Sequence, residues 1–121
     1  MKKLFLTILL MSLPANVQAS RLFNEAAYRD EFCSQQNGIT EYKLADFTRV
    51  DCLTPEYAIE IDFAKKWAEA VGQSLHYGIM TGKKPGIVLI VENLKDYTYL
   101  NRLKSICQRY GIRLWYAEAP N

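Results

Sequence analysis

The chain has 121 residues, with 15 Lys or Arg against 13 Asp or Glu, and half of its residues are hydrophobic. This length is enough for one compact domain and excludes a second one. The near balance of charge excludes a strongly basic domain that would attract nucleic acid as a whole, so binding of that kind would require a local basic patch.

Residues 1–19 are typical of a secretory signal peptide. Two lysines precede an apolar run over residues 4–13 that is too short to span a bilayer, and residues 17–19 resemble a cleavage site. We expect a periplasmic or secreted protein without stable membrane association once this segment is removed; the alternative is an uncleaved membrane anchor. The mature domain, residues 20–121, then has 13 basic and 13 acidic residues and no net charge.

A first helix is predicted over residues 24–36, with Asn24 as its N-cap and Asn37-Gly38 as its end. Residues 41–44 then predict a short first strand.

Two further strands are predicted over residues 49–53 and 57–63, joined by a turn at Thr54-Pro55-Glu56. Side chains alternate between the two faces of a strand. The second strand therefore has a core face and a second face: Ile59, Ile61 and Phe63 on the first, and Ala58, Glu60 and Asp62 on the second.

Closure of this hairpin about Pro55-Glu56 brings acidic residues together. The expected facing pairs are Leu53 with Ala58, Cys52 with Ile59, and Asp51 with Glu60. Directly opposite residues have Cβ atoms roughly 5 Å apart, and like charges there are destabilising. Asp51 opposite Glu60, with Asp62 beside them, is therefore unusual for a purely structural hairpin. A divalent cation would remove the repulsion, and carboxylate oxygens suit Mg²⁺ or Mn²⁺.

The next helix is predicted to follow Phe63 and to run through residues 67–77. One stripe of this helix is formed by residues spaced by four, three and four: Lys66, Ala70, Gln73 and Tyr77. A neighbouring apolar stripe for packing is formed by Trp67, Val71, Ser74, Leu75 and Gly78.

The remaining residues predict a loop over 80–86, a buried central strand over 87–91, a second amphipathic helix over 94–110 and a last strand over 112–117. A strand–helix–strand unit of this kind is a right-handed crossover with parallel strands. The order α-β-β-β-α-β-α-β predicts the α/β class, as a three-layer sandwich around a mixed sheet that is antiparallel in the hairpin and parallel afterwards.

Asp51, then Glu60-x-Asp62 on the next strand, then Gln73-x-x-x-Tyr77 on the following helix resemble the PD-(D/E)XK nuclease superfamily, the restriction-endonuclease-like fold. The helix motif is most similar to the Q-x-x-x-Y of its RecB-type branch. The resemblance implies that Asp51 and Glu60 are ligands of Mg²⁺ or Mn²⁺. It implies that Gln73 and Tyr77 position the substrate strand or support the metal site, and that the activity is hydrolysis of phosphodiester bonds in DNA or RNA.

One position departs from the family. Its signature lysine, two residues after the acid, positions the attacking water and stabilises developing negative charge, and Asp62 stands in its place. Lys66 is the candidate for a migrated ammonium, and Lys65 is less well placed. Asp62 would then be a third ligand or would orient the water. The acidic residue that the family often carries on its first helix would be Glu25 or Glu31.

Other residues leave alternatives open. Three cysteines, Cys33, Cys52 and Cys107, permit one disulfide after export, and the sequence does not choose the pair. Two lysine pairs are candidates for a basic patch or for ordinary solvated surface: Lys65 with Lys66, and Lys83 with Lys84.

Three functions are compatible with these patterns. The first is a secreted, metal-dependent nuclease. The second is a catalytically inactive module on the same fold that binds nucleic acid or protein, which Asp62 and the absence of net charge favour. The third is a structural protein of the cell envelope in which the acidic cluster is only surface.

Overall fold

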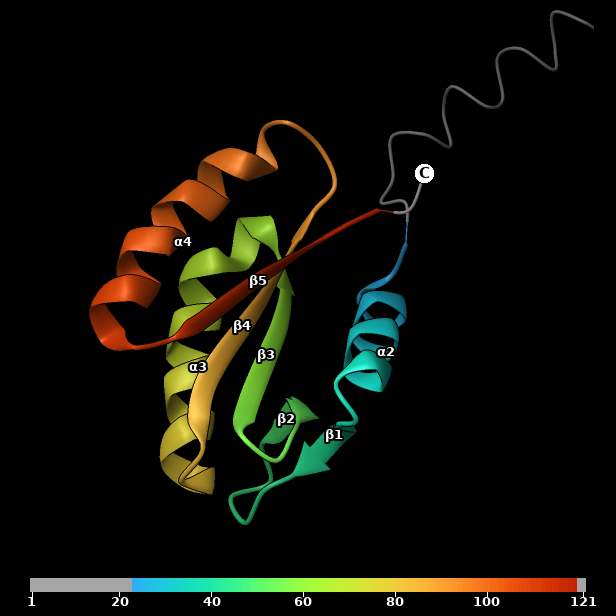
Figure 1. The fold of residues 1–121 in the computed structure, drawn as a ribbon, viewed down its shortest axis with the longest axis vertical. Helices are drawn as coiled ribbons and strands as arrows, with labels where there is room; N and C mark the ends of the chain where they lie inside the picture. The colour runs from blue at the N-terminus through green and yellow to red at the C-terminus, as the bar shows by residue number, and fades with distance from the viewer. Residues whose placement is uncertain (1–22, 120–121) are drawn as a thin grey trace, which may run out of the picture.

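The computed structural model describes residues 23–119. Its elements are α2 (Glu25–Gln35), β1 (Ile39–Lys43), β2 (Arg49–Leu53), β3 (Tyr57–Phe63), the 3₁₀ helix η1 (Ala64–Lys66), α3 (Trp67–Thr81), β4 (Lys84–Val91), α4 (Asp96–Tyr110) and β5 (Arg113–Glu118). Apart from η1, this is the predicted order. Figure 1 shows α2 on one side of the sheet and α3 and α4 on the other, which gives three layers. The predicted α/β class is confirmed.

The five strands lie side by side in the order β1-β2-β3-β4-β5. The pairs β1–β2 and β2–β3 are antiparallel, and the pairs β3–β4 and β4–β5 are parallel. This mixed sheet matches the prediction, because α3 and α4 are long enough to return the chain to the same end of the sheet. The central strands β3 and β4 are buried along most of their length.

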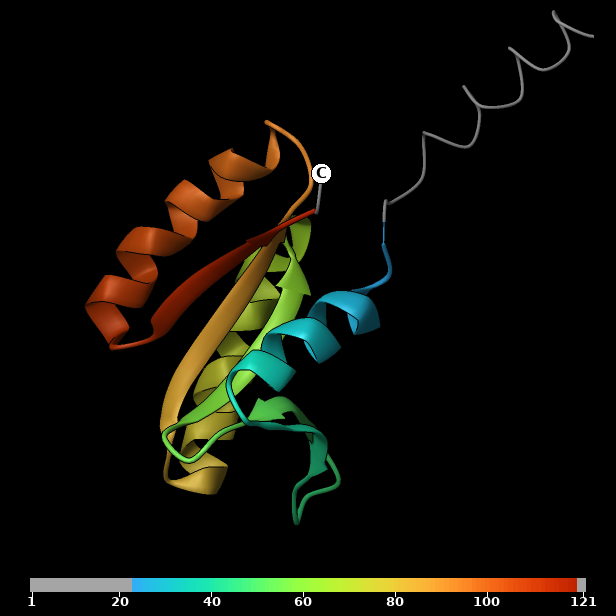
Figure 2. The same cartoon turned by 45° about the vertical axis from the view of Figure 1, so that its right-hand side comes forward.

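Two hydrophobic cores form on the two faces of the sheet. On the face covered by α2, Ile59 and Ile61 pack with Tyr28, and Figure 2 shows α2 lying across this face. On the other face, Ile87 and Leu89 of β4 pack with residues of α4. Because strand residues alternate, the second face of β3, with Ala58, Glu60 and Asp62, points toward the α3 side of the sheet. The sequence pattern therefore places two carboxylates in a buried layer.

The predicted loop over residues 80–86 is wrong. The helix α3 continues to Thr81, Gly82 ends it with a φ of 70°, and β4 already begins at Lys84. Glycine adopts this left-handed conformation without the penalty of a Cβ atom. Pro85 is tolerated in β4 because β5 begins to pair only at Gly86, so the proline lies at the open start of the strand.

Smaller differences occur at other boundaries. The first strand is Ile39–Lys43 rather than 41–44, the residues directly after Phe63 form η1 before α3 begins at Trp67, and α4 begins at Asp96 rather than at 94. The two hairpin strands have the predicted bounds. Asn24 is the predicted N-cap, and its side chain accepts a hydrogen bond from the Ala27 N–H at 2.9 Å.

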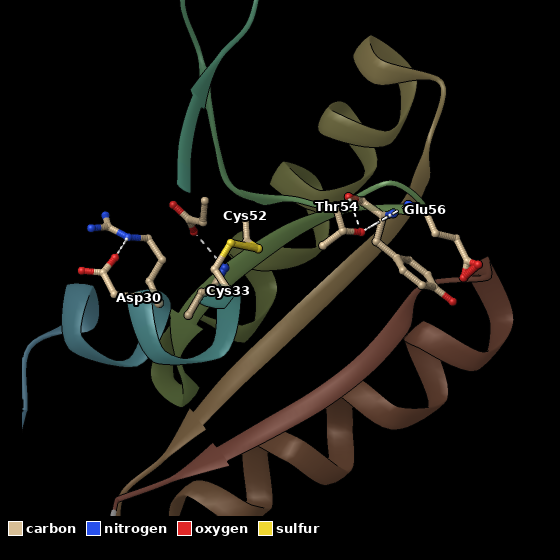
Figure 3. Close-up of a disulfide and its surroundings, with 9 residues drawn as sticks. Asp30, Cys33, Cys52, Thr54 and Glu56 are labelled. Atoms are coloured by element: carbon tan, nitrogen blue, oxygen red, sulfur yellow. Dashed lines mark hydrogen bonds and ion pairs between the residues drawn. A yellow bond between two sulfur atoms is a disulfide. The ribbon is translucent and has the colours of Figure 1, made fainter. Parts of the chain in front are cut away.

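A disulfide joins Cys33 of α2 to Cys52 of β2, and Cys107 is a buried free thiol. Figure 3 shows the bond connecting the helix layer to the strand that carries Asp51. A Cβ atom at Gly38 would lie 2.5 Å from the Cys52 Sγ and 2.6 Å from the Cys33 Sγ, so glycine is required beside the bond. For the sequence separation of 19, loop-closure entropy predicts a stabilisation of about 3 kcal/mol.

The predicted signal peptide, residues 1–19, lies outside the described residues. Within residues 23–119, the structure contains no helix with the length and apolar character that a membrane span needs.

Candidate active site

The β2–β3 ladder ends where the acidic residues lie. Its paired positions are Cys52 with Ile59 and Leu53 with Ala58, as predicted. Beyond them, the Asp51 carboxylate accepts a hydrogen bond from the Ile61 N–H at 2.8 Å. A side chain thus takes the place of a backbone acceptor between the two strands. Asp51 and Glu60 consequently meet through their carboxyl groups rather than as a backbone pair.

Glu60 and Asp62 are almost fully buried, with 5% and 4% exposure, and Asp51 is half-buried. The carboxyl groups of Asp51 and Glu60 lie close enough to share a hydrogen bond. The Glu60 Oε2 atom is buried and has no hydrogen-bond partner among the described residues. Neither Asp51 nor Glu60 forms an ion pair with any residue between 23 and 119. A buried carboxylate without a cationic partner is costly, so this pair is incomplete as it stands.

Three carboxyl groups in this cluster have raised pKa values. Burial is the main reason that the pKa of Glu60 is raised, followed by the charges of Asp51 and Asp62. Burial also raises the pKa of Asp51 to about 6, with a contribution from the charge of Glu25. Burial and the charge of Glu25 raise the pKa of Asp62 to about 7, although Lys66 acts in the opposite direction. Clustered carboxyl groups with raised pKa values mark a candidate functional site.

The helix α3 adds two polar side chains to this cluster. Tyr77 is buried, and its hydroxyl donates a hydrogen bond to Glu60 and accepts one from the Gln73 amide. Burial, followed by the charges of Glu60 and Asp51, raises the pKa of Tyr77, so the phenol keeps its proton. The predicted Gln73-x-x-x-Tyr77 stripe therefore reaches the carboxylates, with Gln73 on its exposed side. It forms a hydrogen-bonded chain from solvent to Glu60.

Lys66 and Lys65 are both exposed, at the junction between η1 and α3. The charge of Lys66 lowers the pKa of Asp62, which places its ammonium near the cluster, but the two groups do not form an ion pair in the described chain. Lys65 has no such effect on the three carboxyl groups. The assignment of the migrated ammonium to Lys66 stays a prediction.

The helix α2 contributes Glu25, whose charge raises the pKa values of Asp51, Glu60 and Asp62. Glu31, the alternative, is exposed and contributes to none of the three. The sequence patterns do not predict a role for Arg29 and Glu41, which form an ion pair at 2.6 Å and whose charges act on Asp51. Arg29 lies on α2 and Glu41 on β1, so their approach to Asp51 depends on tertiary packing that local sequence patterns do not show.

A divalent cation requires several oxygen donors that converge on one point. Within residues 23–119, no three His, Cys, Asp or Glu side chains are grouped in a way that could hold a metal ion. Asp51 and Glu60 nevertheless form a pair of oxygen donors, and the Glu60 Oε2 atom has no hydrogen-bond partner in the part of the chain that the structure describes. Mg²⁺ characteristically takes one or two carboxylates and completes its shell with water and substrate phosphates. The pair therefore fits Mg²⁺ or Mn²⁺ as a site of two protein ligands.

The two lysine pairs named from the sequence do not form one patch. Lys65 and Lys66 precede α3, whereas Lys83 and Lys84 follow it. The 15 residues of α3 separate the two pairs by about 22 Å. The first pair includes Lys66, whose charge acts on Asp62.

No family model matches the chain, and no solved structure matches it. Two KilA-N domain-containing proteins of Acanthamoeba polyphaga mimivirus are similar to it. One is 29% identical over 90 residues, which cover 74% of this chain and 24% of the viral protein. The other is 34% identical over 67 residues, which cover 54% of this chain and 26% of the viral protein. The chain spans about a quarter of the length of the curated relatives it matches.

Proposed function

We propose that this protein is a secreted nuclease that hydrolyses phosphodiester bonds of DNA or RNA with the help of Mg²⁺ or Mn²⁺. The observation that carries the proposal is the approach of the half-buried Asp51 carboxyl group to the buried Glu60 carboxyl group. Within residues 23–119 neither group has an ion-pair partner, and one Glu60 oxygen has no hydrogen-bond partner. Such a pair costs stability when it is ionised, and a bound cation would compensate that cost.

Each side chain has a defined role in this proposal. Asp51 and Glu60 hold the cation, which when bound supplies polarised water and stabilises charge on the phosphate. Tyr77 fixes the orientation of Glu60 through its hydroxyl, and Gln73 fixes Tyr77. Asp62, whose pKa is about 7, exchanges a proton near neutral pH and is suited to orienting the attacking water.

Lys66 offsets the negative charge that develops on the phosphate. Its ammonium is near Asp62 but not paired with it, so it is free to approach a substrate oxygen. This arrangement supports the proposed restriction-endonuclease-like fold, in which the signature lysine would have moved from the strand to the start of α3. The secreted or periplasmic location rests on residues 1–19 alone.

Asp62 also favours a second candidate, a catalytically inactive module that binds nucleic acid or protein. A carboxylate where the family carries a lysine removes a positive charge from the site, and the expected mature chain, residues 20–121, has no net positive charge to replace it. This candidate predicts binding that weakens as salt rises, with no turnover in any metal.

The experiment that separates the two candidates compares two neighbouring lysines. Purified protein is incubated with DNA or RNA in Mg²⁺ or Mn²⁺, and initial rates are measured for wild type, Lys66→Ala and the matched control Lys65→Ala. We expect Lys66→Ala to lower kcat by about 10²-fold, because it removes one charge that acts on the transition state. Lys65→Ala should stay close to wild type. Absence of cleavage by the wild-type protein in both metals would refute the nuclease in favour of the binding module.

A further inference from the structure

A cationic and aromatic surface lies at the outer end of the β1–β2 hairpin. We call it the hairpin surface, and it consists of Tyr42, Lys43, Phe47, Arg49, Met80 and Lys83. Figure 2 shows the turn between β1 and β2 projecting from the end of the molecule. A hollow of about 250 Å³ opens beside this turn, and Tyr42, Lys43, Met80 and Lys83 contribute to its lining. None of the residues that line it is acidic.

Phe47 at the tip of the turn is held in an unfavourable conformation with its ring in solvent. Its φ is 71°, and 75% of the residue is exposed. The Asp46 carboxylate fixes the turn by accepting hydrogen bonds from the Thr48 N–H at 3.1 Å and the Thr48 hydroxyl at 2.6 Å, and by pairing with His76 of α3 at 2.7 Å. A large residue at positive φ is rare, and such strain persists where the surrounding structure enforces it. The ring is thus presented rigidly without contributing to the core.

The cations of the hairpin surface repel one another. Lys43 and Arg49 are directly opposite across the β1–β2 ladder, and neither forms an ion pair with a described residue. Like charges at such positions are destabilising. The Lys43 ammonium lies 4.8 Å from the centre of the Phe47 ring. Lys83 donates one hydrogen bond to the Pro55 carbonyl at 2.8 Å, which leaves two of its three donors for a ligand. Binding of an anionic partner would reduce the repulsion between these positive charges.

We infer that the hairpin surface binds a single strand of nucleic acid, with a base stacked on Phe47 and phosphates against Lys43, Arg49 and Lys83. Exposed aromatic rings among cations are the usual platform for unpaired bases, because every base has a face that can stack. A base inside a duplex is already stacked and cannot reach the ring. The inference rests on the proposed function for the class of ligand and adds that the strand is unpaired.

The position of the hairpin surface fits a substrate that continues into the candidate active site. Arg49 precedes Asp51 by two residues on β2, and neither is buried, whereas Val50 and Cys52 are fully buried. Two residues along a strand correspond to about 7 Å. A strand held by Lys43 and Arg49 would therefore begin two residues along β2 from Asp51, one of the two proposed metal ligands.

The test measures binding in EDTA, so that no cleavage occurs. A fluorescent oligothymidylate of about 12 nucleotides, within the usual site size of single-strand-binding domains, is titrated with the full-length protein and followed by anisotropy. Phe47→Ala should weaken binding by about tenfold through the loss of one stacked base. The control Tyr110→Ala, which removes an exposed ring at the end of α4, should bind as wild type.

Two further variants test whether the loss of affinity comes from unfolding and whether the Lys43 charge contacts phosphate. Phe47→Gly relieves the positive φ, so its melting temperature should not fall below that of wild type while its affinity falls as in Phe47→Ala. Lys43→Ala should reduce the slope of log affinity against log salt by about 0.7, whereas the exposed Lys104 on α4, changed to alanine, should leave it unchanged.

Three results would overturn the inference: equal affinity of wild type and Phe47→Ala, tighter binding of a duplex of the same length, or a Phe47-dependent binding to phosphatidylglycerol vesicles with none to the oligonucleotide. The outcomes for the two proposals are distinguishable. Phe47-dependent binding without cleavage in Mg²⁺ would keep the hairpin surface and refute the nuclease. If the wild type cleaves in Mg²⁺ and Phe47→Ala binds the oligonucleotide as the wild type does, the nuclease is kept and the hairpin surface is refuted.

Discussion

Replacing Asp51 with asparagine, or Glu60 with glutamine, is expected to lower the rate of phosphodiester cleavage in Mg²⁺ by roughly 10³-fold. Each change keeps the size of the side chain and removes one of the two carboxylates that meet between β2 and β3. An amide is a weaker ligand for Mg²⁺ than a carboxylate, and the metal supplies several kcal/mol of transition-state stabilisation. The measurement is the single-turnover rate on a labelled oligonucleotide.

The control for this loss is Glu69→Gln, which neutralises an exposed carboxylate on the same helix as Gln73 and Tyr77. Its rate should equal that of the wild type. The double variant Asp51→Asn, Glu60→Gln should lose little more than either single variant, because the two ligands act as one unit. Single variants that keep most of the wild-type rate would remove Asp51 and Glu60 from the site.

The same Glu60→Gln variant is expected to be more stable than the wild type in EDTA at pH 8, by on the order of 2 kcal/mol. The pKa of Glu60 is raised by burial and by the charges of Asp51 and Asp62. Between the ordinary pKa of a glutamate and this raised value, the folded state holds more protons than the unfolded state. Wild-type stability therefore falls as pH rises above about 4.5. The neutral glutamine removes this loss.

Urea denaturation at pH 5 and pH 8 measures the effect. The gain from Glu60→Gln should be small at pH 5 and large at pH 8, whereas the exposed Glu56, changed to glutamine, should show no gain at either pH. A Glu60→Gln variant that is less stable than wild type at pH 8 would mean that the native fold already compensates the Glu60 charge. The cluster would then be a structural network, and the case for a cation between Asp51 and Glu60 would be lost.

Alternation along the chain was enough to predict the hairpin. The strands Arg49–Leu53 and Tyr57–Phe63 have the predicted bounds, because their apolar residues follow the two-residue period and Thr54-Pro55-Glu56 marks the turn. The Thr54 hydroxyl accepts hydrogen bonds from the N–H groups of Glu56 and Tyr57, as Figure 3 shows. Strand bounds and turns of this kind depend on neighbouring residues along the chain, so a single sequence is sufficient to predict them.

Features that depend on tertiary contacts could not be predicted in this way. The hydrogen bond from the Ile61 N–H to Asp51 separates β2 from β3, and no spacing in the sequence signals it. The pairing of Cys33 with Cys52 depends on how α2 packs on the sheet. The sequence indicates Lys83 as a candidate for a basic patch but does not indicate Phe47. Only the structure shows that the Phe47 ring is held at positive φ in solvent.

Calorimetric titration of the protein with Mn²⁺, in two buffers of different ionisation enthalpy, tests the central claim most directly. We predict one cation per chain, with release of protons at pH 6, because carboxyl groups with raised pKa values must lose their protons to bind metal. Asp51→Asn should abolish the binding and Glu69→Gln should not change it. Failure to bind Mn²⁺ at millimolar concentration, or equal binding by Asp51→Asn, would contradict a cation held between Asp51 and Glu60.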